Sequence, residues 1–91
     1  MQYDISLTPK AQIGAIKLAK SEPKAYKKLN ALIDELREHP LTGTGKPEPL
    51  KEDKRGRWSR RITDKHRLVY EIHGNEVLVI VISVYGHYED K

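Results

Sequence analysis

The second half of the chain combines side chains that could cleave RNA without a metal ion. A carboxylate, several guanidinium groups and an imidazole lie in three segments, GKPEPLK (45–51), WSRRITDKHRLVY (58–70) and GHY (86–88). A ribonuclease must deprotonate a 2′-hydroxyl, stabilise the extra charge on the phosphate and protonate the departing 5′-oxygen. A carboxylate or an imidazole can take the first proton, an arginine can hold the phosphate, and an imidazolium can give the last proton. The expected products are a 2′,3′-cyclic phosphate and a 5′-hydroxyl.

Positive charge is concentrated in the same part of the chain. Residues 46–67 contain nine Lys or Arg and four Asp or Glu, whereas the whole chain carries a net charge of +4. Such a local excess favours a polyanionic partner, although a solvated basic surface that binds nothing would give the same count. The sequence offers no good cluster of metal ligands, so we expect no metal and no other cofactor.

Length and composition narrow the class of protein. The 91 residues indicate a single domain covering residues 1–91. The absence of cysteine excludes a disulfide framework and thiolate chemistry. No apolar run approaches the roughly 20 residues needed to cross a bilayer, and the N-terminal residues lack the pattern of a signal peptide. We therefore expect a cytoplasmic protein with no membrane partner.

The first half predicts a short strand followed by two helices. Residues 3–7 alternate as a strand, and Thr8-Pro9 is a helix start signal for a helix that ends near Lys20. Ile13 and Ile16, with Ala19 or Lys20, are expected along one side of this helix. A second start signal, Ser21-Glu22-Pro23, precedes a helix that ends at His39-Pro40. Its expected buried stripe consists of Tyr26, Leu29, Leu32, Ile33 and Leu36.

The second half predicts a long loop and three strands. The loop, residues 42–57, is rich in Gly, Pro and Lys, and the strands cover residues 58–63, 67–73 and 76–85. Gly74-Asn75 suits a tight hairpin between the last two strands. The order β-α-α-β-β-β implies an α+β fold, in which a small antiparallel sheet of about four strands carries the two N-terminal helices on one face.

Alternation of side chains along a strand predicts which residues share a face of the sheet. We expect a turn of residues 64–66, which pairs Thr63 with Arg67, Ile62 with Leu68 and Arg61 with Val69. The helix-covered side then holds Trp58, Ile62, Leu68, Tyr70 and Ile72, and the open side holds Ser59, Arg61, Thr63 and Arg67. Arg60 does not fit this pattern and is expected where the strand reaches the sheet edge.

Four motifs, in this order, resemble the YoeB/Txe toxins of bacterial type II toxin–antitoxin systems, which belong to the RelE-like superfamily. The motifs are GKPEPLK, WSRRIT, HRLVY and the closing HY, and the resemblance covers roughly residues 41–88. It implies an endoribonuclease that cuts messenger RNA in the ribosomal A site. It also implies a YefM-like antitoxin as partner, contact with DNA only through that antitoxin, and a homodimer as an oligomeric state.

The resemblance also implies roles for individual residues. Glu48 matches the general base, His87 the general acid and Arg67 the phosphate-stabilising arginine. The positions that line the same site are Lys51, Arg61 and Tyr88. Considered without the resemblance, Glu48 could equally be a solvated carboxylate beside a lysine, and the two arginines could be cross-strand ion-pair partners.

The sequence around His87 supports its selection among four histidines. Gly86 can adopt a positive φ and bend the chain, and antiparallel pairing returns the last strand to the start of the strand at Arg67. The other histidines are expected at a helix end, in a turn and at a hairpin rim, which are His39, His66 and His73. A second hypothesis is that the protein has the same fold but is not an enzyme. It would then be a non-catalytic module that binds RNA or the ribosome through the basic face and so blocks translation.

Overall fold

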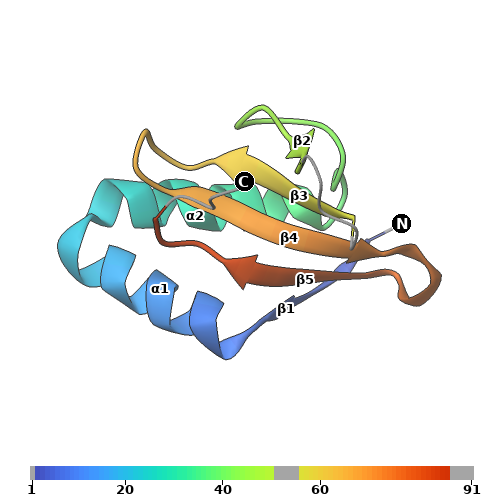
Figure 1. Ribbon diagram of the computed structural model, residues 1–91, viewed down its shortest axis with the longest axis horizontal. Coiled ribbons are helices and arrows are strands. Elements are labelled where there is room, and N and C mark those ends of the chain that lie inside the picture. The colour runs from blue at the N-terminus through green and yellow to red at the C-terminus, as the bar shows by residue number, and fades with distance from the viewer. Residues whose placement is uncertain (1, 51–55, 87–91) are drawn as a thin grey trace.

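The computed structural model describes residues 2–50 and 56–86, which form a sheet with two helices on one face (Figure 1). The elements are β1 (Asp4–Leu7), α1 (Pro9–Ser21), α2 (Pro23–Leu36), β2 (Glu48–Pro49), β3 (Arg57–Arg61), β4 (Arg67–His73), a short 3₁₀ helix (Gly74–Glu76) and β5 (Leu78–Ser83). The predicted α+β class is confirmed. Neither helix in the described part of the chain is long and apolar enough to cross a membrane.

The sheet has five strands in the order β1-β5-β4-β3-β2, and β1 runs parallel to β5 while the other neighbours are antiparallel. The expectation of about four antiparallel strands was therefore wrong in strand number and in one direction. The extra strand is a two-residue pairing inside the predicted loop, Glu48 with Ser59 and Pro49 with Trp58. A proline-rich segment can pair there because β2 is an edge strand. No hairpin joins β1 to β5, so local sequence did not fix their relative direction.

The starts of both helices follow their sequence signals. The Thr8 hydroxyl accepts a hydrogen bond from the Ala11 N–H at 3.1 Å and donates one to the Ile82 carbonyl at 2.8 Å, so the cap also ties α1 to the end of β5. At the second start signal the N-cap position is Glu22, and the Ser21 hydroxyl instead donates back to the Lys17 carbonyl at 2.7 Å.

The side of α1 that carries Ile13 and Ile16 is not the side that packs against the sheet. Ile13 and Ile16 are each 56% exposed, and the buried residues are the smaller Ala11 and Gly14 together with Leu18. The reason is the closeness of the helix to the chain after β5. A Cβ atom at Gly14 would lie 3.0 Å from side-chain atoms of both Val84 and Tyr85, so this face admits only small residues where the two segments meet.

Helix α2 supplies most of the large apolar residues that the two helices contribute to the core. Leu29, Leu32 and Leu36 are buried as predicted and Ile33 packs against them, but Tyr26 lies at the surface and Ala25 takes the inward position. The sheet contributes the buried residues Ile62, Leu68, Tyr70, Val79 and Val81, with Trp58 and Ile72 packed partly buried against them.

The register of β3 and β4 differs from the prediction by two residues. Arg61 pairs with Arg67, Arg60 with Leu68 and Ser59 with Val69. Because side chains alternate with a period of two, this shift changes the partners and leaves the faces as predicted. The turn is longer than expected, covering residues 62–66, and the Thr63 hydroxyl accepts hydrogen bonds from the Lys65 and His66 N–H groups at 3.1 Å.

The hairpin between β4 and β5 is also longer than predicted. His73 pairs with Leu78, so the connection is the 3₁₀ helix plus Val77 rather than the tight turn expected at Gly74-Asn75. Val77 adopts a left-handed backbone conformation, with a φ of 51°, where the chain turns back into β5. The change shortens the last strand, because it begins only at Leu78.

Arg60 is fully buried, so its expected place at the sheet edge was wrong. Its side chain lies on the helix-covered face, and its two terminal nitrogens reach backbone carbonyls of the loop that follows α2. Those carbonyls belong to His39, Thr42 at 2.7 Å and Thr44 at 3.4 Å. The carboxylate of Glu35 at 3.3 Å and the Tyr70 hydroxyl at 3.2 Å complete the set. A guanidinium has five N–H groups, and five acceptors surround this one.

We expect Arg60→Leu to lower the free energy of unfolding by about 3–5 kcal/mol, because it leaves carbonyl groups and a carboxylate without their donor in the interior. Urea denaturation measures the change. The matched control is Arg61→Leu at the exposed neighbouring position, which should alter stability by no more than about 0.5 kcal/mol. Equal effects at the two positions would contradict the structural role of Arg60.

Acid should weaken the same cluster. The Thr44 N–H, 2.8 Å from Glu35 Oε1, and the Arg60 guanidinium outweigh desolvation and lower the pKa of Glu35. A carboxyl with a lowered folded-state pKa stabilises the protein above its ordinary value of 4.5, and that contribution disappears as the pH falls through the folded-state pKa. Glu35→Gln should therefore flatten the acid dependence of unfolding in urea, whereas Glu76→Gln on the exposed turn should keep the wild-type slope.

Candidate functional site

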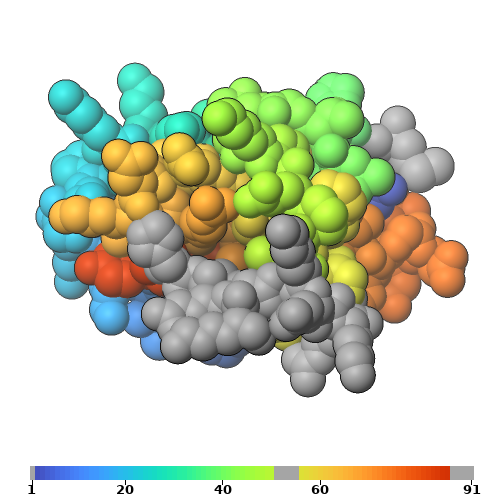
Figure 2. Space-filling model, turned by 45° about the horizontal axis from the view of Figure 1, so that its top comes forward, coloured from blue at the N-terminus to red at the C-terminus, as the bar shows by residue number. Residues whose placement is uncertain are grey.

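Two of the predicted catalytic residues meet on the open face of the sheet. Glu48 lies on β2 and Arg67 begins β4, and the Glu48 Oε1 and Arg67 Nη1 atoms are 3.3 Å apart across β3. Figure 2 shows the yellow-green β2 segment lying against the orange residues at the start of β4. The Glu48 side chain is 60% exposed and that of Arg67 is 25% exposed, so the pair is open to a substrate from solvent.

Arg61 brings a second guanidinium to the same face. It is the direct cross-strand partner of Arg67, and its nearest carboxylate oxygen among the described residues is that of exposed Asp64 at 4.0 Å. Like charges directly opposite each other in a sheet repel. Glu48 contacts Arg67 at 3.3 Å, whereas fully exposed Asp64 lies 4.0 Å from Arg61, so the repulsion is offset only in part. A phosphate bound between the arginines would relieve this repulsion through charge-assisted hydrogen bonds.

The end of the described chain is fixed to Arg67. The Gly86 carbonyl accepts a hydrogen bond from the Arg67 N–H at 3.0 Å, and the Gly86 N–H donates to His66 Nδ1 at 2.8 Å. Gly86 has a φ of 82°, which confirms the predicted bend. His87 follows Gly86 directly in the sequence.

The structure thus brings together three of the predicted site residues, Glu48, Arg61 and Arg67. His87, Tyr88 and Lys51 lie outside the described residues. The last described residue before Lys51 is Leu50, whose N–H donates to the Arg57 carbonyl at 2.9 Å and so continues the pairing of β2 with β3.

Two of the arginines counted in the basic segment do not offer a free charge at the surface. Arg60 lies in the interior, and Arg57 donates to Glu71 at 2.9 Å. Burial raises the pKa of Glu71, but hydrogen bonds and charge from Arg57 and His73 outweigh it, and the net pKa is lowered. This carboxylate therefore stays ionised and holds Arg57. Residues 2–50 and 56–86 contain no group of three or more side chains suited to a metal ion.

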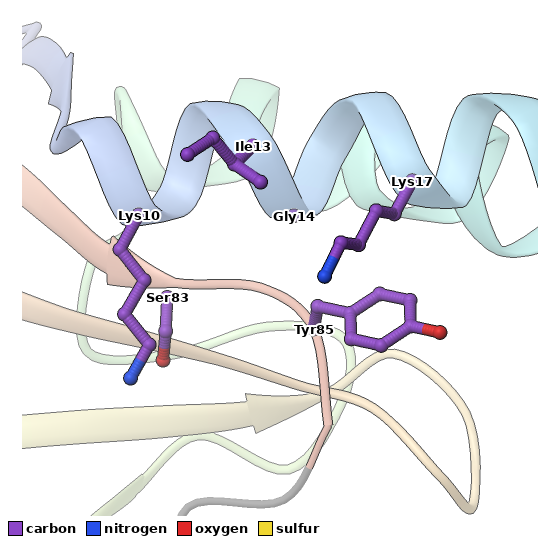
Figure 3. A pocket seen from close by; sticks show the side chains of 6 residues that line it. All are labelled: Lys10, Ile13, Gly14, Lys17, Ser83 and Tyr85. Atoms are coloured by element: carbon purple, nitrogen blue, oxygen red, sulfur yellow. The ribbon is translucent and has the colours of Figure 1, made fainter.

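A separate hollow of about 390 Å³ lies between α1 and the chain after β5 (Figure 3). Its walls come from Ile13, Gly14, Ser83 and Tyr85, while the side chains of Lys10 and Lys17 extend along its rim. The Lys17 ammonium is 5.3 Å from the centre of the Tyr85 ring. Of the predicted site residues that the structure describes, none lines this hollow. Its mostly apolar walls with two cations suit a peptide rather than a reaction centre.

Sequence reasoning missed two residues that organise the site. Arg60 positions the loop before β2. Because Arg60 lies two residues after Trp58 on the same strand, the period of two was the sequence signal that could have placed it on the buried face. His66 was expected in a turn without a function. It does lie in the turn, but it is only 3% exposed, and its Nε2 is 2.6 Å from Glu22 Oε2. No sequence signal could have linked these two, because 44 positions separate them.

The arrangement of elements is that of the RelE-like toxins. The RelE–RelB complex of Pyrococcus horikoshii contains a chain that is 15% identical over 94% of this chain and 96% of that chain, with a TM-score of 0.76, which shows a common fold. A YoeB/ParE toxin from Agrobacterium tumefaciens is 36% identical and superposes with a TM-score of 0.86 over 93% of this chain and 99% of that one.

Sequence comparison assigns the family. The model of the YoeB-like toxin of bacterial type II toxin–antitoxin systems matches residues 15–88, and the chain belongs to this family. Toxin YoeB of Streptomyces coelicolor is 51% identical over 62 residues, which are 68% of this chain and 74% of that protein. Solved structures of a Staphylococcus aureus YoeB dimer and a YoeB–YefM complex are each 34% identical over 97% of this chain and 100% of theirs, with TM-scores of 0.83 and 0.79.

Proposed function

We propose that this toxin is a metal-independent endoribonuclease that cleaves messenger RNA in the ribosomal A site and thereby inhibits translation. The observation that carries the proposal is the contact of Glu48 with Arg67 at 3.3 Å, beside the point where Gly86 is bonded to Arg67. A carboxylate and a guanidinium share one exposed face, and the residue after Gly86 is a histidine.

The three groups divide the reaction between them. Glu48 accepts the proton of the 2′-hydroxyl, and the freed 2′-oxygen forms a bond to phosphorus. Arg67 holds the non-bridging oxygens through its planar fork, with Arg61 opposite it as a second cation. His87 donates its proton to the 5′-oxygen as the bond from phosphorus to that oxygen breaks. The products are a 2′,3′-cyclic phosphate and a 5′-hydroxyl. Glu48 has gained one proton and His87 has lost one, and proton exchange with water restores both groups.

The resting ion pair fits this cycle. When no substrate is bound, Arg67 forms an ion pair with Glu48 at the surface, with Nη1 and Oε1 3.3 Å apart. A bound phosphate can accept two parallel hydrogen bonds from Arg67, whereas Glu48 accepts one at 3.3 Å, so a phosphate competes for the guanidinium. The carboxylate of Glu48 is then released to act as the base.

The openness of the site supports dependence on the ribosome. General acid and base catalysis contribute about 10²–10⁴ each, and a charge stabiliser contributes about 10²–10³. The rest of the acceleration requires the 2′-oxygen to be held in line with the leaving oxygen. A surface with Glu48 60% exposed offers little to orient RNA, whereas a codon fixed in the A site supplies that alignment.

The hollow beside α1 supports a YefM-like antitoxin as the partner. Its apolar walls and the two lysines of its rim complement an acidic segment with apolar side chains. The Staphylococcus aureus relative forms a complex with YefM, and that relative also occurs as a dimer. Contact with DNA through the antitoxin, and homodimerisation of this chain, stay predictions.

Arg67→Ala should lower mRNA cleavage about 10²–10³-fold, and Glu48→Gln and His87→Ala should each lower it about 10²–10⁴-fold. The assay is translation in the presence of 70S ribosomes with mapping of RNA end groups. Lys65→Ala, an exposed cation of the neighbouring turn, is the control and should cleave as the wild type does. Stalled translation with intact messenger RNA would instead establish the non-catalytic blocking module.

Ile13→Asp should weaken binding of the antitoxin at least tenfold and leave RNA cleavage unchanged, because it places a carboxylate against an acidic peptide at the wall of the hollow. Titration calorimetry with the purified antitoxin measures the affinity. Asn30→Asp on the exposed face of α2 makes the same change of charge elsewhere and should bind normally. Equal losses for both variants would place the antitoxin on another surface.

A further inference from the structure

We propose that His66 is a positioning residue for the catalytic end of the chain. This inference rests on the proposed ribonuclease function and adds a residue to which the reaction itself assigns no role. The buried imidazole joins the start of α2 to the last described residue before His87, through Glu22 on one side and Gly86 on the other.

The partners of the ring define its proton arrangement. A backbone N–H can only donate, so Nδ1 must accept the hydrogen bond from Gly86 at 2.8 Å. Glu22 Oε2, at 2.6 Å from Nε2, is an acceptor, so the proton of a neutral imidazole lies on Nε2. The single neutral tautomer therefore makes both contacts at once.

The ring is held firmly enough to act as a support. It is buried, and its centre lies 4.6 Å from that of the Tyr85 ring. The His66 carbonyl accepts hydrogen bonds from the N–H groups of Ile62 at 3.0 Å and Thr63 at 3.1 Å, which close the turn between β3 and β4. Backbone and side chain are therefore fixed by separate sets of contacts.

The hydrogen bond between His66 and Gly86 restrains a glycine, the residue type with the greatest backbone freedom. Gly86 has no side chain to restrict it and already adopts a φ of 82°. The Gly86 carbonyl accepts a hydrogen bond from the Arg67 N–H, and the Gly86 N–H donates one to His66. These two hydrogen bonds, one on each side of the glycine, place the chain relative to the phosphate-binding arginine. Loss of the His66 bond frees the peptide that precedes His87, and misplacement of about 1 Å can lower a rate about 10²-fold.

Two substitutions separate the two contacts of the ring. The oxygen of an asparagine side chain lies near the place of Nδ1 and can accept from Gly86, but it cannot reach Glu22. A glutamine amide reaches the place of Nε2 and can donate to Glu22, but it offers no acceptor beside Gly86. We expect His66→Gln to lower kcat for ribosome-dependent cleavage about 10²-fold with little change in KM, and His66→Asn to restore kcat to near the wild-type value.

Stability and amide exchange complete the experiment. Rates are normalised to the folded fraction from urea denaturation, and His66→Leu is a second variant without an acceptor beside Gly86 if the glutamine variant does not fold. The Gly86 amide should be protected from hydrogen exchange in the wild type and His66→Asn, and unprotected in the acceptor-free variant. Equal normalised kcat values in all variants, or losses that follow stability alone, overturn the positioning role. Absence of cyclic-phosphate ends with the wild-type protein overturns the proposed function, and the inference with it.

Discussion

The guanidinium of Arg60 lies in the interior with each of its N–H groups directed at an oxygen, and the site depends on this arrangement. Its acceptors come from α2, from β4 and from three carbonyls of the loop that leads to β2. Burying such a charge costs several kcal/mol unless its hydrogen bonds are satisfied. The loop therefore has one favoured path, because only that path gives the cation its carbonyls. The path ends where Glu48 pairs beside Ser59, within reach of Arg67.

Adjacent arginines serve opposite purposes in this protein. Side chains of successive strand residues point to opposite faces, so Arg60 enters the core while Arg61 faces solvent opposite Arg67. The inner arginine gains stability from fixed partners. A bound anion would stabilise the outer pair, because exposed Glu48 and Asp64 offset its mutual repulsion only in part. A single strand thus supplies a structural cation and a solvent-facing cation from neighbouring positions.

The face that carries Glu48 and Arg67 and the hollow beside α1 are separate surfaces that meet at two consecutive residues. Tyr85 lines the hollow and lies against the His66 ring, while Gly86 is bonded to His66 and to Arg67. A ligand in the hollow would therefore contact the segment that leads to His87. This connection gives a physical route by which a bound partner could act on the site without covering it.

Motifs and alternation in the sequence determined the class of fold, the start of each helix, the buried face of α2 and the faces of the central strands. These features follow from local rules, such as the Thr8 cap and the period of two along β3, that need no knowledge of distant residues. The three-dimensional arrangement decided the buried face of α1, the extra strand at Glu48, the exact strand partners and the places of Arg60 and His66. Each of these depends on contacts between segments far apart in the chain, such as Gly14 against Val84 and Glu22 against His66, which no local pattern encodes.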